Sequence, residues 1–286
     1  MTSPQNSLPD QSGRTIIVTG STSGIGRATA TALAAANARV VLAVRNVEKG
    51  ADVAASIPGE TLVRELDLAD LSSIRRFAAG WSGPIDVLVN NAGVSSPTLE
   101  RTVDGFELQF GTNHLGPFAL TNLLLPYITG RVVALSSQAE RMARLDLDDL
   151  NGERTPYNES RTYANSKLAN VLFTAELQRR LTAAGSAVTT AAAHPGLVAT
   201  NMTGESTGLF GLMVRRFAQS PAEGALPVLL AATADIPGDS FTGPERFMHM
   251  RGGAELIGRS KQAQDAALAS RLWNASETMT GVSFPL

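Results

Sequence analysis

Residues 15–26 read TIIVTGSTSGIG, a short apolar run that ends in a turn rich in glycine. The next ten residues are rich in alanine and leucine and favour a helix. Strand, glycine turn and helix together place free backbone N–H groups at a helix N-terminus, where a pyrophosphate can bind. Gly20 permits the tight turn, Gly24 lets the backbone approach the phosphates, and Gly26 allows close packing of helix on strand. The stretch therefore predicts a dinucleotide site.

Tyr163 and Lys167 stand four residues apart in a chain that has only three tyrosines and three lysines. On a helix the two side chains share one face. A lysine ammonium beside a phenol favours the phenolate and is expected to lower the pKa of Tyr163 from its usual value near 10. The pair therefore predicts a proton donor and acceptor that works near neutral pH.

Strands and helices are expected to alternate from residue 15 to residue 193. The expected strands are 15–19, 39–44, 62–66, 87–90, 131–135 and 188–193, and the expected helices are 25–36, 48–57, 71–81, 106–127 and 162–181. Right-handed crossovers then give an α/β fold, a Rossmann-type doubly wound parallel sheet of about seven strands with helices on both faces. Residues 14–286 are expected to form one domain after a disordered tail over residues 1–13.

Composition excludes several classes of protein. The net charge of -2 and the pI near 6.0 argue against a nucleic-acid partner, which needs clustered cations. The chain has no cysteine and only three scattered histidines, so we expect no disulfide, no thiolate chemistry and no metal site. The N-terminal residues carry no basic side chain before Arg14, and no apolar run is long enough to span a bilayer. A soluble, cytoplasmic protein is expected.

The TGxxxGxG spacing of residues 19–26, together with Tyr163 and Lys167 downstream, resembles the short-chain dehydrogenase/reductase family. The resemblance covers nearly the whole chain after Gly13. It implies hydride transfer between a nicotinamide cofactor and a small-molecule carbonyl compound or alcohol. In the family's set Tyr163 moves the proton, Lys167 binds the nicotinamide ribose, Ser137 holds the substrate oxygen and Asn113 orders a water in the proton path. Ser137 matches as the second serine of a pair.

Other positions match the family's cofactor contacts. These positions are Gly20, Ser21, Ser23, Gly24, Ile25, Gly26, Arg45, Asn46, Asp67, Leu68, Asn90, Ala92, Gly93, Tyr163, Lys167, Pro195, Gly196 and Thr200. Ordinary turn chemistry explains the segments at 90–93 and 195–196 equally well, and a helix cap explains Asp67.

Residues 104–107, 111–117 and 163–170 resemble the branch of the family that contains retinol dehydrogenases and protochlorophyllide reductases. Residues 138–161 match an insertion of that branch, which is expected to shape the substrate mouth. An apolar stretch rich in glycine at about 200–220 suits a substrate lid, and residues 247–250 are expected to complete the pocket. A lipophilic substrate fits these features. The alternatives are a non-catalytic NAD(P)-binding sensor on the same fold and a nucleotide-sugar epimerase or dehydratase.

The cofactor is expected to be NADP(H) rather than NAD(H). Val44 ends the second strand, and Arg45 and Asn46 follow where a member of the family that uses NAD carries an acid. Arg45 can donate to a 2′-phosphate, which an acid would repel.

A homodimer is expected as well. The helices at 106–127 and 162–181 carry more apolar residues than one core-facing stripe needs, and the family commonly pairs them across a two-fold axis. The surplus residues are Leu120, Leu123, Leu124, Val171, Leu172 and Phe173.

Overall fold

A computed structural model describes residues 8–198 and 218–286 of the chain. Within these residues eight strands form one sheet in the order β3-β2-β1-β4-β5-β6-β7-β8. The strands are β1 Thr15–Thr19, β2 Arg39–Val44, β3 Thr61–Glu65, β4 Ile85–Asn90, β5 Ile128–Leu135, β6 Thr189–Ala193, β7 Ser240–Gly243 and β8 Glu255–Leu256. All neighbouring strands are parallel except β7 and β8. The prediction of a doubly wound sheet is confirmed, with β8 as a short antiparallel addition at one edge.

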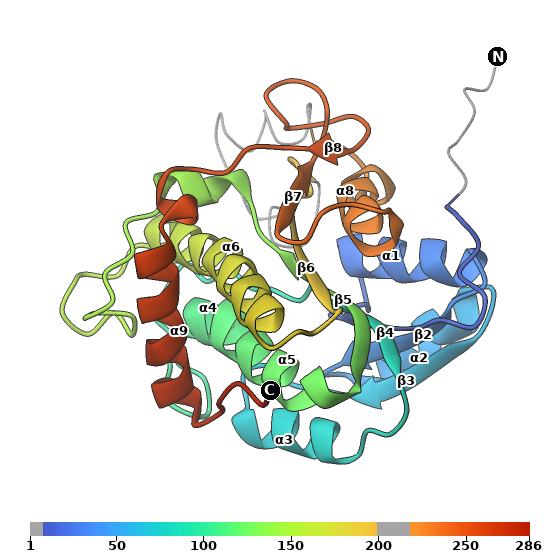
Figure 1. Ribbon diagram of the computed structural model, residues 1–286, viewed down its shortest axis with the longest axis horizontal. Helices are drawn as coiled ribbons and strands as arrows, with labels where there is room; N and C mark the ends of the chain where they lie inside the picture. Colours follow the sequence, from blue (N-terminus) through green and yellow to red (C-terminus); the bar gives the residue numbers. More distant parts are fainter. Residues whose placement is uncertain (1–7, 199–217) are drawn as a thin grey trace.

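Helices cover both faces of the sheet, as Figure 1 shows. The helices are α1 Gly24–Ala35, α2 Val47–Ser56, α3 Leu71–Ala79, α4 Leu108–Phe110, α5 Gly116–Leu124, α6 Glu159–Ala183, α8 Pro221–Thr233 and α9 Ala266–Thr280. Successive side chains of a strand point to opposite faces. In β1, Ile16 and Val18 join the core under α1, α2 and α8, whereas Ile17 joins the core under α3, α5 and α6. Burial on both faces explains why β1 is a continuous apolar run.

The strand order reverses between β1 and β4, which lie side by side although β2 and β3 separate them in sequence. Helices that follow β1 and β4 cover opposite faces, so a crevice opens at the carboxyl ends of these two strands. The glycine turn after β1 and the segment after β4 therefore meet at one edge of the sheet.

The predicted helix 106–127 begins at Leu108, because the Glu107 carboxylate caps its N-terminus by accepting hydrogen bonds from the backbone N–H groups of Gln109 at 2.9 Å and Phe110 at 2.6 Å. The helical run then passes through a π-helical turn at Gly111–Leu115 before it continues as α5. Single π turns within helices are rare and often mark functional positions. This one holds Asn113.

The expectation of a disordered tail up to Gly13 is wrong for residues 8–13. Gln11 is buried, and its backbone N–H donates to the Ala36 carbonyl at 2.7 Å. Leu8 packs against the core under α1, and Asp10 accepts a hydrogen bond from the Asn37 side chain at 2.9 Å. These contacts tie residues 8–13 to the end of α1, which the polar composition of the segment does not reveal.

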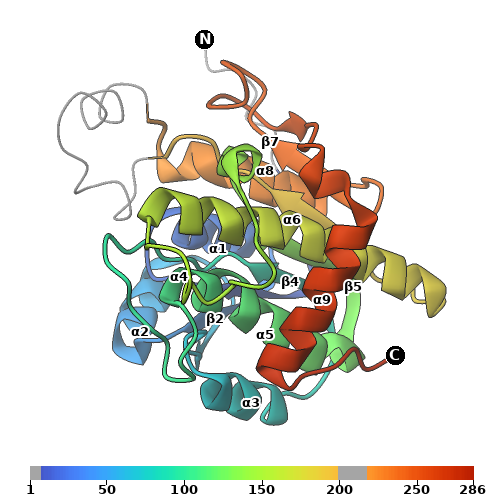
Figure 2. The same cartoon turned by 90° about the vertical axis from the view of Figure 1, so that its left-hand side faces the viewer.

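The basis for a homodimer through α5 and α6 is also wrong. The helix α9, at the C-terminal end of the chain, lies against α6 in both Figure 1 and Figure 2. Trp273 of α9 packs on Phe118 and Phe173, with ring centroids 4.8 and 5.8 Å apart. All six surplus apolar residues lie in cores of this one chain, five of them buried and Leu123 partly buried. The chain therefore covers this helix face itself.

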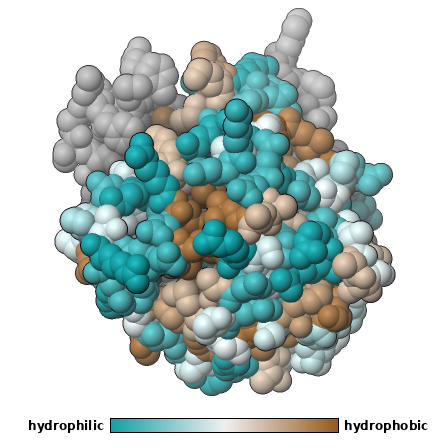
Figure 3. Space-filling view, turned by 60° about the vertical axis from the view of Figure 1, so that its left-hand side comes forward, coloured by the Kyte–Doolittle hydropathy of each residue, from teal (hydrophilic) through white to brown (hydrophobic). Residues whose placement is uncertain are grey.

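The outward side of α9 offers no comparable apolar face. Arg271, Asn274 and Thr278 are exposed along it. Figure 3, which brings this side of the molecule forward, shows a mostly hydrophilic surface with hydrophobic residues gathered in a hollow near its centre. Among the described helices, none combines the length and the apolar composition needed to cross a membrane.

Candidate active site

The glycine turn after β1 forms one wall of a cleft at the carboxyl edge of the sheet. Gly20 and Gly24 have φ angles of +66° and +55°, in the left-handed region that favours glycine. A Cβ on Gly26 would lie 2.4 Å from Asn91 Nδ2 and 2.5 Å from the Gly20 carbonyl oxygen. Helix α1 can therefore approach β1 and β4 closely only because residue 26 is glycine, and its N-terminus faces the cleft.

The cleft continues from the glycine turn past the ends of β2, β3, β4, β5 and β6. Most of the predicted cofactor contacts line it, and they come from the segments that follow β1, β2, β3, β4 and β6 and from helix α6. These residues are Gly20, Ser23, Gly24, Ile25, Gly26, Arg45, Asn46, Asp67, Leu68, Ala92, Gly93, Tyr163, Lys167 and Pro195.

Tyr163 and Lys167 meet at one end of this cleft. Both lie on the first part of α6, and Lys167 Nζ is 5.3 Å from the centroid of the Tyr163 ring. The ammonium also donates to the Leu135 carbonyl at the end of β5, at 3.3 Å. The Ser137 hydroxyl, two residues past β5, lies close enough to the Tyr163 phenol to offset part of the rise in pKa that burial causes there. Three of the four predicted catalytic side chains therefore converge.

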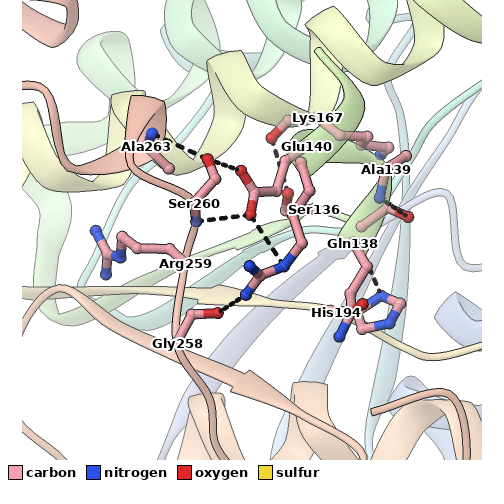
Figure 4. A network of polar contacts seen from close by, with 12 residues as sticks. Ser136, Gln138, Ala139, Glu140, Lys167, His194, Gly258, Arg259, Ser260 and Ala263 are labelled. Carbon is pink, nitrogen blue, oxygen red and sulfur yellow. Dashed lines mark hydrogen bonds and ion pairs between the residues drawn. The ribbon is translucent and has the colours of Figure 1, made fainter. Parts of the chain in front are cut away.

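The paired serines after β5 have different surroundings. Ser136 is buried and its Oγ donates to the Lys167 carbonyl at 2.7 Å, which fixes α6 against β5. Ser137 caps the 3₁₀ turn Gln138–Met142. Figure 4 shows how that turn is anchored: the buried Glu140 carboxylate accepts from the backbone N–H of Ser260 at 2.9 Å and from its hydroxyl. Ser136 lines the cleft, but its hydroxyl is used by the Lys167 carbonyl, whereas Ser137 is partly exposed and lies beside the Tyr163 phenol. The role of Ser137 in holding the substrate oxygen stays a prediction.

Asn113 lies near Tyr163 and Lys167, but both its amide oxygen and its amide nitrogen already form hydrogen bonds within the protein. Its Oδ1 accepts from the Val94 N–H at 2.7 Å, and its Nδ2 donates to the Val94 carbonyl and to Ser166 Oγ, both at 3.0 Å. Ser166 Oγ in turn donates to the Tyr163 carbonyl at 2.8 Å. The amide therefore joins the segment after β4 to the N-terminal half of α6, beside Tyr163. The role of Asn113 in ordering a water stays a prediction.

Comparisons with known proteins agree with this geometry. Residues 14–208 match the family model described as short chain dehydrogenase. The chain belongs to the short-chain dehydrogenase family.

Human retinol dehydrogenase 13 is 40% identical to the chain over 96% of this chain and 86% of its own length. A solved structure titled as a putative uncharacterized protein from Mycobacterium paratuberculosis is 49% identical, covers 98% of this chain and 97% of its own, and has a TM-score of 0.87. The RhlG/NADP active-site complex of Pseudomonas aeruginosa is 25% identical, covers 83% and 96% of the two chains, and has a TM-score of 0.65. This short-chain dehydrogenase is thus an oxidoreductase of alcohols and carbonyl compounds from the retinol dehydrogenase-like branch, in a family that binds NAD(P)(H).

The titration of the catalytic pair in this short-chain dehydrogenase differs from the prediction. Burial raises the pKa of Tyr163 to about 12, and the nearby Ser137 hydroxyl offsets only part of that effect. Burial also lowers the pKa of Lys167 to about 8. Loss of water disfavours both charged forms, and this cost outweighs the attraction between ammonium and phenolate. The phenol is therefore protonated at neutral pH.

Several residues of the cleft were not predicted from sequence, among them the polar residues Lys49, Asn91 and Thr112. Lys49 lies four residues after Arg45, in the first turn of α2, and lines the same end of the cleft. Arg45 precedes the helix, so the i, i+4 rule does not connect the two residues, and the only signal in the sequence was a second cation shortly after β2. Asn91 and Thr112 also line the cleft, and Asn91 Oδ1 and Thr112 Oγ1 are buried with no hydrogen-bond partner in the described part of the chain.

Three predicted cofactor contacts do not line the cleft, and a fourth lies outside the described residues. Ser21 is fully buried. Asn90 is buried too, and its amide donates to Thr121 Oγ1 at 2.9 Å rather than facing the cleft. Gly196 lies next to the cleft residue Pro195, with a φ of +79°. Thr200 and most of the predicted lid at 200–220 fall in residues 199–217, outside the described residues.

Proposed function

We propose that the protein is an NADP(H)-dependent oxidoreductase that interconverts a lipophilic alcohol and its carbonyl compound, with Tyr163 as the general acid and base. The observation that carries this proposal is the convergence of Ser137, Tyr163 and Lys167 at one end of a cleft whose other end is a glycine turn at a helix N-terminus. That arrangement supports binding of a dinucleotide along the cleft with its reactive end beside the phenol.

The residues of the cleft fit a nicotinamide dinucleotide. The N-terminus of α1 and its glycine turn suit a pyrophosphate. Asn91 Oδ1 and Thr112 Oγ1 are buried polar atoms that can hydrogen-bond a ligand in the cleft. Lys167, buried beside Gly93, would hold the ribose hydroxyls next to the nicotinamide. When bound, the cofactor supplies or accepts the hydride.

The protein's own groups supply position and a proton. Ser137 Oγ holds the substrate oxygen beside the phenol, and Tyr163 donates its proton to that oxygen as the carbonyl is reduced. A Tyr163 pKa near 12 keeps the proton on the phenol at neutral pH, which is the form that reduction requires. The phenolate left behind is stabilised by Ser137 and by the Lys167 ammonium. Oxidation of an alcohol uses the same groups in reverse.

Preference for NADP(H) rests on the charges after β2. Arg45 and Lys49 both line the cleft, and no carboxylate from the end of β2 does so. Two cations at this end favour a 2′-phosphate. The neighbour titled as an NADP complex supports the same choice. A lipophilic substrate is supported by the likeness to retinol dehydrogenase 13, which its name links to retinol. A cytoplasmic location is proposed on the sequence alone.

The test is a panel of retinal, aliphatic and aromatic aldehydes with NADPH and NADH, followed by Tyr163→Phe with the best substrate. The variant should keep wild-type NADPH binding and lose turnover by about 10² to 10⁴, the range for a general acid. Tyr127→Phe is the matched control, because Tyr127 is 37% exposed, lies just before β5 and does not line the cleft. NADPH binding without turnover of any carbonyl would support the sensor instead, and normal turnover by Tyr163→Phe would refute the proton assignment.

A further inference from the structure

The turn after β6 forms the wall of the cleft near the catalytic pair. Pro195 of this turn lines the cleft together with Tyr163 and Lys167. At Gly196 the backbone is left-handed, and a Cβ there would lie 2.5 Å from the Met250 carbonyl oxygen and 2.8 Å from Gln219 Nε2. The turn is therefore enclosed by two segments that come from later parts of the chain.

Gln219 connects these segments to the turn. It is buried, with 2% of its surface exposed. Its Nε2 donates to the Pro195 carbonyl at 2.6 Å, its Oε1 accepts from the Gly252 N–H at 3.1 Å, and its backbone N–H donates to the Leu197 carbonyl at 2.8 Å. Both ends of the side-chain amide are thus used, one on the turn and one on the 244–252 segment after β7.

A second set of contacts ties the same turn to the Ser137 segment. His194 is buried, and its Nδ1 accepts from the backbone N–H groups of Gln138 at 3.3 Å and Gly196 at 3.4 Å. The Gln138 side chain donates to the Met248 carbonyl at 3.0 Å. Burial lowers the pKa of His194 to about 4, so its ring is neutral at pH 7 and can accept. The turn, the Ser137 segment and the 244–252 segment therefore form one bonded unit.

We propose that Gln219 is a positioning residue for hydride transfer: it fixes the Pro195–Leu197 turn, and through it the wall of the cleft beside Tyr163. This role rests on the proposed function. Chemistry depends steeply on the placement of the reacting groups, and a 1 Å displacement can cost roughly a hundredfold in rate. Loss of the Gln219 amide leaves the Pro195 carbonyl and the Gly252 N–H without these partners, so the turn shifts while the phosphate end of the cleft is untouched.

The test compares Gln219→Leu with a matched control, Gln11→Leu. Gln11 is equally buried at 2% and also donates to a proline carbonyl, that of Pro9 at 2.8 Å, but it lies before β1. We expect Gln219→Leu to lower kcat for carbonyl reduction about tenfold to a hundredfold while the Kd for NADPH stays within about threefold. Gln11→Leu should lower the melting temperature without lowering kcat. Equal kcat values in wild type and Gln219→Leu, or an equal loss of kcat in both variants, would overturn the proposal.

Gln219→Glu gives a readout that a general loss of stability does not produce. At neutral pH the carboxylate cannot donate to the Pro195 carbonyl, whereas the protonated carboxyl group can. The kcat of this variant, as a ratio to wild type at each pH, should therefore rise as the pH falls from 8 to 5. A flat ratio contradicts the assigned role.

A wild-type protein that reduces no carbonyl would refute the proposed function but would not decide the role of Gln219. Hydrogen exchange of the Leu197 N–H, which donates to the Met250 carbonyl at 2.9 Å, then decides it. Faster exchange in Gln219→Leu than in Gln11→Leu supports control of the turn by Gln219. Equal exchange overturns it.

Discussion

Replacement of Arg45 and Lys49 by alanine, singly and together, should weaken or abolish the proposed preference for NADP(H) over NAD(H). Arg45 follows the last residue of β2, and Lys49 lies four residues further on, in the first turn of α2. The Asn46 side chain accepts from the Lys49 N–H at 2.8 Å, which fixes the backbone between the two cations. Both side chains are exposed and line the cleft, so they can reach a phosphate without desolvation in advance.

The size of the effect follows from exposure. A charge-assisted hydrogen bond contributes about 1.5 to 3 kcal/mol, and the lower end applies to side chains in solvent. Each single variant should therefore weaken NADPH binding about tenfold. The two cations act on one phosphate, so their effects are coupled, and the double variant should lose between about tenfold and a hundredfold. Binding of NADH should change by less than about threefold, since it has no 2′-phosphate.

Titration of cofactor fluorescence gives the dissociation constants of NADPH and NADH for each protein. Arg39→Ala is the control for net charge, because Arg39 begins β2 at the opposite edge of the sheet and pairs with Glu60 at 3.0 Å. Equal or tighter binding of NADH by the wild type would refute the reasoning. An equal loss of NADPH affinity in Arg39→Ala would show that only overall charge matters.

Four further outcomes are expected. Trp273→Ala should lower the free energy of unfolding, measured in urea, by about 3 to 5 kcal/mol, because Trp273 is buried. Light scattering of the wild type should give the mass of one 30.0 kDa chain. A doubled mass would contradict the inference that α9 covers the apolar face of α5 and α6. Burial lowers the pKa of His114 and His194 to about 4. The free energy of unfolding should therefore fall by ~3 kcal/mol per histidine as the pH drops from 6.5 to 4, because the unfolded chain takes up the protons first. Thermal unfolding of His114→Gln should show a smaller fall over the same pH range. Gly26→Ala should weaken NADPH binding at least about tenfold, because its Cβ would meet Asn91 Nδ2; unchanged affinity would contradict the close packing of α1.

The positions of the strands were open to prediction because burial on both faces demands continuous apolar runs. Residues 15–19 and 39–44 are such runs and match β1 and β2 residue for residue. The secondary structure from residue 218 onward was harder to predict from the sequence. Helices α8 and α9 and the short strands β7 and β8 lie there, and their packing partners come from distant parts of the chain.

Local chemistry explains which parts of the site the sequence by itself determined. Two motifs depend only on residues close together in the sequence: the glycines at a fixed spacing after a strand, and a tyrosine and a lysine one helical turn apart. The sequence pattern alone therefore predicts the dinucleotide site and the proton donor. Tertiary structure alone decided what depends on distant contacts: the pKa of Tyr163 rises because its surroundings exclude water, Lys49 reaches the cleft through the placement of α2, and Gln219 meets Pro195 across 24 positions of sequence. The same holds for α9, whose packing on α5 and α6 covers the surface that their apolar residues alone would assign to a second subunit. The burial of a side chain depends on the whole fold, and a short stretch of sequence does not show which distant residues will cover it.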